Sequence, residues 1–194
     1  MNHRSFSFKA AARAAGAVAL VAGVLSGVTL VPASADGGGD SVVVRLRDDC
    51  DPATFNAIVG PGACVGGGGT TFSEFVAAMA GGGHHGWRFQ PSIKDVKPGT
   101  TLRIENRGGE THSFTEVVNF GTITLPDPNA TALLNSSLPT GTPKAVPVNP
   151  EPAAVGATFV PAGGTLMLPV LSPGVHKFEC FIHPWMRSTI NVKK

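Results

Sequence analysis

Hydrophobic and polar residues alternate in short runs over the C-terminal part of the chain, from residue 87 to 194. This alternation has the period of a half-buried β-strand. Gly, Pro or Asn residues separate most of the runs, as turns do. The runs expected to form strands are WRFQPSIKDV, TTLRIEN, HSFTEVVNF, GTLMLPVL, GVHKFECF and MRSTINVKK. Several short strands joined by turns predict an all-β fold, either a sandwich or a barrel.

The segment before this region carries the start signals of two short helices. Asp51 offers an N-cap, and Pro52 follows it at the first helical position. Thr71 and Glu74 have the spacing of a capping box. The two predicted helices cover residues 53–59 and 72–80. We therefore expect residues 36–86 to form a linker and a small, partly helical N-terminal extension.

Residues 1–35 have the pattern of a secretory signal peptide. Three basic residues precede an apolar run, and the run closes with Ala33-Ser34-Ala35, the small-x-small pattern that signal peptidase cleaves. The run could just reach the length of a membrane anchor, but it is rich in Ala and Gly and the cleavage pattern follows it directly. The pattern predicts a secreted or extracytoplasmic protein with no membrane span after cleavage.

The slightly basic charge of the chain belongs to this leader. The whole chain has 15 Lys and Arg against 13 Asp and Glu. Removing the leader takes away three basic residues and no acidic ones, which leaves 12 against 13 and a formal charge of −1. The remaining charge does not favour a nucleic acid or an anionic membrane as a partner.

The three cysteines divide into a pair and a single residue. Cys50 and Cys64 lie close together in the extension, and Cys180 lies far from both. The simplest arrangement is one Cys50–Cys64 disulfide, with Cys180 left for chemistry. An unpaired thiol in an oxidising compartment needs a reason to persist, and metal ligation supplies one.

The segment ECFIHPWMR places Cys180, His183 and Met186 three residues apart, just after a predicted strand. A thiolate, an imidazole and a thioether form a soft ligand set that suits copper. His112, which opens a strand after a predicted turn, is the natural fourth ligand. Each residue alone would be read as structural, since lone Cys and Met residues usually fill core space. Zinc is a weaker candidate because a thioether adds little to its usual ligand set.

With this ligand pattern, residues 87–194 resemble the cupredoxins, with a ligand loop most like the amicyanin/plastocyanin-type proteins. The short spacing Cys-x-x-His-Pro-x-Met is similar to that of amicyanin, whereas plastocyanin and azurin use longer loops. The resemblance implies a Greek-key β-sandwich that holds one type 1 copper ion and transfers single electrons between Cu(I) and Cu(II). It implies that His112, Cys180, His183 and Met186 are the ligands, with His183 near the surface and Met186 axial. It also implies a monomeric electron carrier with a redox partner protein, not an enzyme.

Two features depart from the family pattern. Sixty-seven residues separate His112 from Cys180, more than the compact amicyanin type carries, and the excess is a long Pro-rich insertion at 121–164. Ser113 follows the first ligand, where many family members have an Asn that ties the two ligand loops together. The sequence therefore does not predict which hydrogen bonds surround the ligands.

The apolar residues beside the second histidine suggest where a partner could dock. His183, Pro184 and Trp185 could form an apolar docking patch for the redox partner. Equally, Trp185 could pack against the extension or the long insertion, because exposure cannot be read from sequence.

Other functions and sites fit less well. Copper delivery, storage or sensing without electron relay would use the same ligands and stays open as the alternative. A copper enzyme would need further histidine-rich sites, for which the chain has too few histidines. A structural module that binds no copper would not need the four-residue set. His84, His85 and His176 are read as structural or solvated residues.

Overall fold

The computed structural model describes residues 40–121, 147–149 and 152–194. Residues 37–194 form one compact unit. The predicted leader, residues 1–35, and most of the predicted insertion, residues 122–146 and 150–151, lie outside the described residues. Among the residues that are described, no helix has the length and apolar character needed to cross a membrane.

The first of two four-stranded sheets has the order β2-β1-β4-β8. Strands β1 and β4 pair in parallel, and the other neighbours pair antiparallel. The sheet consists of β1 (Ser41–Arg47), β2 (Arg88–Gln90), β4 (Thr101–Asn106) and β8 (Thr165–Leu168).

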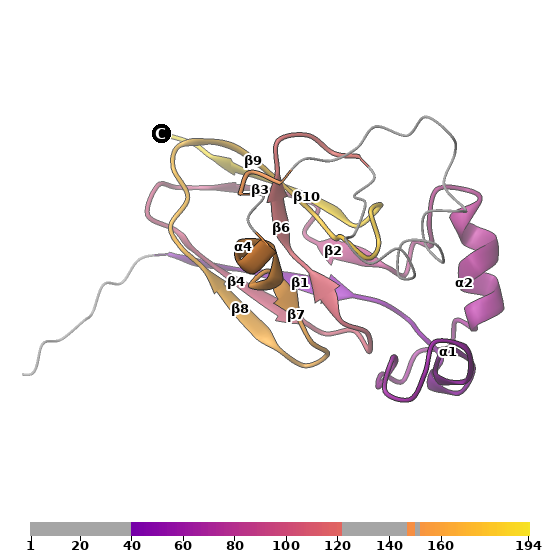
Figure 1. The fold of residues 1–194 in the computed structure, drawn as a ribbon. Coiled ribbons are helices and arrows are strands. Elements are labelled where there is room, and N and C mark those ends of the chain that lie inside the picture. The colour runs from indigo at the N-terminus through magenta and orange to yellow at the C-terminus, as the bar shows by residue number, and fades with distance from the viewer. Residues whose placement is uncertain (1–39, 122–146, 150–151) are drawn as a thin grey trace, which may run out of the picture. The chain divides into compact units, whose positions relative to one another are not determined.

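The second sheet has the order β3-β10-β9-β6 and lies against the first (Figure 1). It consists of β3 (Ile93–Val96), β6 (Thr115–Val117), β9 (Gly174–Glu179) and β10 (Arg187–Val192). A two-stranded ribbon pairs β5 (His112–Ser113) with β7 (Phe159–Val160). The predicted β-sandwich is confirmed.

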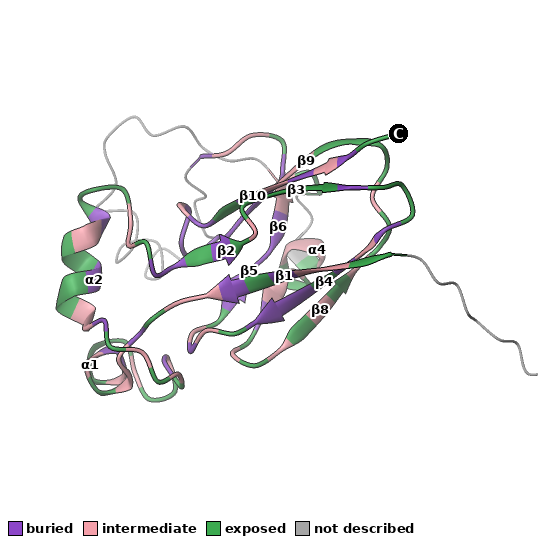
Figure 2. Cartoon of the chain, turned by 180° about the vertical axis from the view of Figure 1, so that it is seen from behind, coloured by how far each residue is buried: buried purple, intermediate pink, exposed green. Residues whose placement is uncertain are grey.

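The core lies between the two sheets and follows the alternation seen in the sequence. Leu46 and Ile104 of the first sheet and Ile190 of the second are completely buried, and Figure 2 shows buried residues along strands of both sheets. Phe114 stacks on Phe178 with ring centroids 4.3 Å apart. Burying each such side chain contributes roughly 1.5–3 kcal/mol, so this layer supplies much of the stability.

Strand β1 is an integral part of the sandwich, although its residues fall within the predicted extension. It lies between β2 and β4, and its sequence SVVVRLR alternates so that Val44 and Leu46 are buried while Arg45 is exposed. The expected domain boundary at residue 87 therefore does not coincide with the start of the sandwich.

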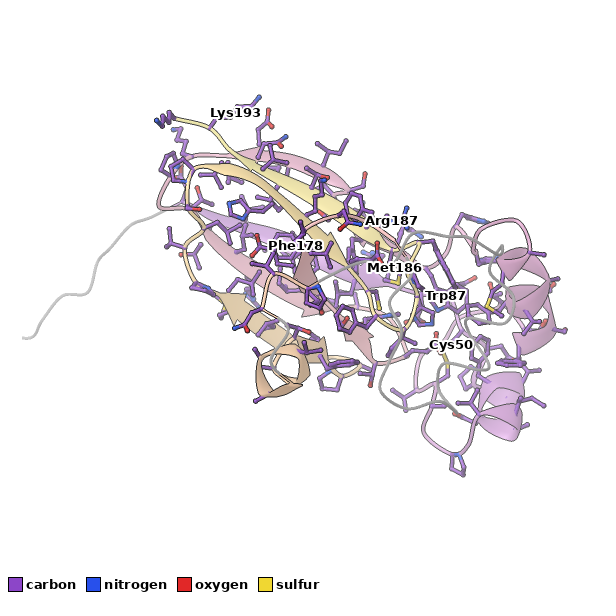
Figure 3. All side chains as sticks on the ribbon, turned by 45° about the horizontal axis from the view of Figure 1, so that its top comes forward. Cys50, Trp87, Phe178, Met186, Arg187 and Lys193 are labelled. Carbon is purple, nitrogen blue, oxygen red and sulfur yellow. A yellow bond between two sulfur atoms is a disulfide. The ribbon has the colours of Figure 1, made fainter. Side chains whose placement is uncertain are left out.

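The helical part of the extension forms as predicted. Helix α1 (Pro52–Ile58) is capped by Asp51, and helix α2 (Phe72–Met79) begins with the Thr71–Glu74 capping box. Figure 3 shows Cys50, Trp87 and Met186 at the end of the sandwich that is nearest these helices.

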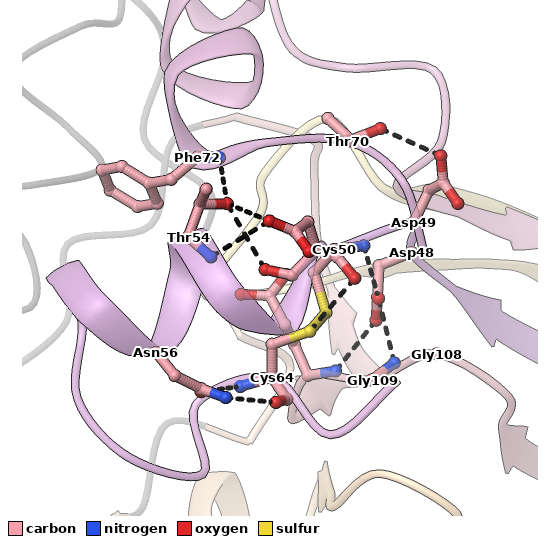
Figure 4. Close-up of a disulfide and its surroundings, with 12 residues drawn as sticks. Asp48, Asp49, Cys50, Thr54, Asn56, Cys64, Thr70, Phe72, Gly108 and Gly109 are labelled. Carbon is pink, nitrogen blue, oxygen red and sulfur yellow. Dashed lines mark hydrogen bonds between the residues drawn. A yellow bond between two sulfur atoms is a disulfide. The ribbon is translucent and has the colours of Figure 1, made fainter. Parts of the chain in front are cut away.

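The expected Cys50–Cys64 disulfide is present, with Cα atoms 6.2 Å apart (Figure 4). Asn56 of α1 reinforces it, since its side chain donates to the Cys64 carbonyl and accepts from the Cys64 amide. The disulfide therefore fixes α1 to the loop that follows it.

The described part of the predicted insertion contributes to the sandwich. Helix α4 (Pro152–Gly156) leads into β7, which pairs His112 with Val160. Pro147 forms an isolated bridge with Val117 at the edge of the second sheet.

Candidate metal centre

Three of the four predicted ligands converge in a buried cluster. His112 Nδ1 lies 3.2 Å from His183 Nδ1, and Cys180 Sγ lies 4.0 Å and 3.9 Å from these two nitrogens. None of the three residues is more than 1% exposed. Strand β5 supplies His112, and the segment after β9 supplies the other two, so the fold joins ligands that are far apart in sequence.

The spacing of these three atoms matches ligands around one ion. With bonds of about 2.0–2.1 Å to nitrogen and about 2.3 Å to sulfur, the nitrogens would subtend roughly 100° and each nitrogen–sulfur pair roughly 130°. A single bound ion can span both of these angles, so His112, Cys180 and His183 could hold one metal ion together.

Met186 closes the loop that carries Cys180 and His183. The Cys180 amide donates to the Met186 carbonyl at 3.1 Å, and the Met186 amide donates to the His183 carbonyl at 2.8 Å. The loop is short because β9 and β10 are antiparallel neighbours that pair Glu179 with Arg187. Met186 is completely buried in the main core.

Ser113 joins the two ligand segments. Its amide donates to Cys180 Sγ at 3.4 Å, and its hydroxyl accepts from the Phe181 amide at 2.8 Å. Thr115 in turn donates to the Ser113 hydroxyl at 3.2 Å. Ser113 thus ties the two ligand segments together, which the sequence had left open.

Asp48 holds the far side of the His112 ring. Its Oδ2 accepts from His112 Nε2 at 2.7 Å, which leaves Nδ1 facing Cys180 and His183. Asp48 lies directly after β1 and is 1% exposed in its side chain. Sequence reasoning missed it because no motif marks Asp48, and only the pairing of β1 with β4 brings it to His112.

The hydrogen bonds also set the protonation of the cluster. Burial opposes ionisation of the Cys180 thiol, but hydrogen bonds from His112 and His183 outweigh it and lower its pKa well below the usual range. Burial likewise opposes the charge of Asp48, yet the hydrogen bond from His112 brings the pKa of that carboxyl to about 2. The thiol is therefore prepared to act as a thiolate, the form that binds metals.

The extension and its neighbours cover the second histidine. His183 is 1% exposed, and the rings of Phe75 in α2 and of Trp185 lie 5.8 Å and 5.5 Å from it, both at T-shaped angles. Glu110 Oε2 lies 3.7 Å from His183 Nε2 and accepts a hydrogen bond from Trp87. The expectation that His183 lies near the surface is therefore wrong for this structure.

The expected docking patch is changed by the same packing. Pro184 is buried together with His183, and Trp185 is half-buried. The Trp185 ring lies against Gly83, where a Cβ would approach it to 2.2 Å, and packs 5.9 Å from Phe75. The packing of Trp185 against the extension agrees with the alternative interpretation of this residue.

The other histidines in the described part of the chain, His84, His85 and His176, make structural contacts. His84 accepts from the Gly86 amide and stacks on His85 at 4.6 Å, and His176 hydrogen-bonds Glu116 at 2.6 Å. Over the described ranges, one other group of potential ligands comes together, Asp48, Cys50 and Glu110. Its cysteine belongs to the disulfide, so this group is no second metal site.

No family model and no curated protein matches the sequence. Solved structures similar to this chain are cupredoxins. A purple cupredoxin from Nitrosopumilus maritimus is 14% identical, with a TM-score of 0.39 over 78% of this chain and 98% of its own. A plastocyanin from Dryopteris crassirhizoma is 16% identical, with a TM-score of 0.33 over 78% and 100%. A mutant of amicyanin in the Cu(I) form is 16% identical, with a TM-score of 0.34 over 55% and 73%. These values are too low to transfer a function, which must rest on the ligand geometry.

Proposed function

We propose that this protein is an exported type 1 copper protein that transfers single electrons. His112, Cys180 and His183, which converge in the fold, would hold the ion together with Met186 as a weak fourth ligand. The ion would supply a reversible one-electron couple between Cu(I) and Cu(II). The signal-peptide pattern of residues 1–35 supports export. The proposed protein is a monomeric carrier with a redox partner and not an enzyme.

The observation that carries this proposal is the convergence of His112 Nδ1, His183 Nδ1 and Cys180 Sγ in one buried cluster. Two imidazoles and one thiolate, with a methionine at the end of the same loop, are the ligand set of blue-copper electron-transfer sites. Zinc fits this set less well, because structural zinc sites are closed sets of Cys, His or carboxylate ligands and a thioether adds little to them.

Residues outside the ligand set hold the ligands in position and shield them from water. Asp48 and Ser113 hold His112 and Cys180 from outside the ligand set, and the strands fix the backbone on both sides. Phe75, Trp87 and Trp185 exclude water from His183. A site fixed in this way needs little rearrangement when its charge changes, which is what an electron carrier requires.

We place the docking surface for a redox protein at Trp185. His183 and Pro184 are buried, while the half-buried Trp185 contacts His183 and also reaches the surface. A partner that covers Trp185 would come as near to the centre as the packing of the extension allows. This retains the predicted docking region but assigns the contact to one residue.

Copper delivery, storage or sensing without electron relay is the second candidate. The burial of His183 under the extension keeps this candidate open, because a covered ligand slows exchange of electrons with large partners, although the cover slows exchange of the ion as well. A carrier should exchange electrons quickly and reversibly, whereas a copper-handling protein should exchange the ion itself.

The visible absorption spectrum tests the proposal most directly. The purified mature protein should develop an intense thiolate-to-copper band on addition of Cu(II), and ascorbate should bleach it reversibly. Cys180→Ala should show no such band, while Cys50→Ala/Cys64→Ala, which removes the other two cysteine sulfurs, should keep it. A protein that binds copper without the band would exclude the electron carrier and leave copper handling.

A further inference from the structure

We infer that Asp48 is a positioning residue of the metal centre that raises its metal affinity and biases it toward Cu(II) over Cu(I). The bias toward Cu(II) rests on the proposed function, whereas the effect on affinity applies to any divalent ion that the cluster binds. Nothing in the sequence pattern marked this residue, and it lies outside the ligand set.

Asp48 is held rigidly in a buried position. Its two oxygens accept from the amides of Cys50, Gly109 and Glu110 at 3.3, 2.9 and 3.0 Å, in addition to the bond from His112 Nε2 at 2.7 Å. The amides of Cys50 and Gly109 donate to Oδ1, and the Glu110 amide shares Oδ2 with the imidazole. The position of Asp48 is therefore set by the backbone, and Asp48 in turn sets the orientation of His112.

The loop that receives this carboxylate is shaped for it. A Cβ on Gly108 would lie 1.9 Å from Asp48 Oδ2, and one on Gly109 would lie 2.8 Å from Cys50 Sγ and 2.4 Å from the Gly66 amide nitrogen. Figure 4 shows Asp48 between Cys50 and the two glycines. The absence of side chains at Gly108 and Gly109 therefore leaves the space that the Asp48 carboxylate and the disulfide occupy.

A carboxylate on the far nitrogen makes an imidazole a better electron donor and fixes which nitrogen faces the metal. Its negative charge, buried beside the ligand, stabilises the higher charge of Cu(II) more than that of Cu(I), because burial leaves the interaction poorly screened. Removing the charge should weaken binding of a divalent ion and raise the reduction potential.

Titration with Co(II), followed by its visible absorption, measures the affinity without any redox step. Asp48→Asn keeps the shape and removes the charge, and we expect it to bind Co(II) about 10–100-fold more weakly. The matched control is Asp49→Asn, which removes the same charge one residue along, where Asp49 contacts Thr70 and the Gly69 amide instead of the centre. Equal Co(II) affinity of wild type and Asp48→Asn would overturn the inference.

Gly108→Ala gives a second, independent variant. Its methyl group would lie 1.9 Å from Asp48 Oδ2, so the carboxylate would have to shift from its present position while the charge of the protein stays the same, and Co(II) binding should weaken in the same direction. A measurement on the wild type needs no variant at all. In the Co(II) protein, the shifted Nε2 proton of His112 should exchange slowly with solvent, and rapid exchange would contradict the hydrogen bond to a buried carboxylate.

The copper protein tests the bias between oxidation states. A tenfold loss of preference for Cu(II) in Asp48→Asn corresponds to a rise of about 59 mV for a one-electron couple, with no change in Asp49→Asn. A potential that is unchanged while Co(II) affinity falls would reject the bias and keep the positioning role. If the wild type binds Co(II) but forms no blue copper site, the proposed function fails, and the Co(II) comparison still decides the role of Asp48.

Discussion

Single residues outside the ligand set hold the candidate centre together. Ser113 bonds the thiolate through its amide and the following segment through its hydroxyl. Asp48 holds one imidazole from behind. Such contacts orient the ligands of metal sites, and their loss commonly costs much of the affinity. Substitutions at Ser113 and Asp48 therefore test the metal affinity of the centre, as substitutions of the ligands do.

Ser113→Ala should destabilise the protein by about 1–3 kcal/mol, because the buried Phe181 amide loses its acceptor and becomes unsatisfied. Urea unfolding of the metal-free protein measures this change. The matched control is Ser172→Ala at an exposed position, where a change within about 0.5 kcal/mol is expected. Equal stabilities of the two variants would mean that Ser113 does not tie the ligand segments together.

Glu105 provides a pH-dependent contribution away from the centre. It is paired with Arg107, Arg103 and Arg45 at 2.9, 3.0 and 3.9 Å, and the hydrogen bond from Arg107, assisted by the other charges, lowers the pKa of its carboxyl below 4.5. A lowered folded-state pKa contributes stability that is complete above the unfolded pKa and is lost as the pH falls through the folded pKa.

Glu105→Gln should therefore unfold at a lower temperature than wild type at pH 7, and the gap should close as the pH falls below about 4. Thermal unfolding at a series of pH values checks this. Asp40→Asn, which removes an exposed carboxylate 3.9 Å from Lys97, should change little at any pH. A gap that stayed constant as the pH fell to about 3 would show that packing, not charge, explains the Glu105 effect.

At the scale of elements, helix α2 of the extension packs against His183 and covers the candidate centre. Its amphipathic sequence buries Phe75 and Met79 while Val76 remains exposed. Phe75 contacts both His183 and Trp185, so the same side chain that anchors the helix also shields a ligand. The stability of the helix and the access of solvent to the centre are therefore linked.

Phe75→Ala should cost about 3–5 kcal/mol of stability, as for other buried phenylalanines, and should open His183 to solvent. Urea unfolding gives the first quantity, and the rate at which a chelator removes bound metal gives the second, expected to rise severalfold. Val76→Ala on the exposed side of the same helix is the control for both. Unchanged chelation kinetics in Phe75→Ala would show that α2 does not gate access.

For the whole molecule, metal binding and folding should be coupled, because ligands from two distant segments meet only in the folded chain. A ligand present at about 100 times its dissociation constant stabilises the folded state by about 2.7 kcal/mol. For a domain of this size, that corresponds to a rise in Tm of about 5–10 °C.

Copper in excess should therefore raise the Tm of the wild type by about this amount, and a chelator should reverse it. Cys180→Ala should lose most of the shift, since it lacks the thiolate. Differential scanning calorimetry with and without the ion makes the comparison. A shift of equal size in Cys180→Ala would place the bound copper elsewhere on the chain.

The sequence by itself determined the elements and the ligand types. Alternation predicted the strands, because one face of each strand must be apolar to pack against the other sheet. Asp51, Thr71 and Glu74 predicted the helix starts, since capping is decided by residues close in sequence. The spacing of Cys180, His183 and Met186 predicted the ligand loop for the same local reason.

Only the tertiary structure decided what surrounds those ligands. Asp48 reaches His112 because β1 pairs with β4, and Phe75 covers His183 because α2 folds back over the end of the sandwich. Both contacts join residues more than 60 positions apart in the sequence. Contacts of this kind depend on the packing of whole elements, which no local pattern records, and for that reason the burial of His183 and the role of Asp48 could not be read from the sequence.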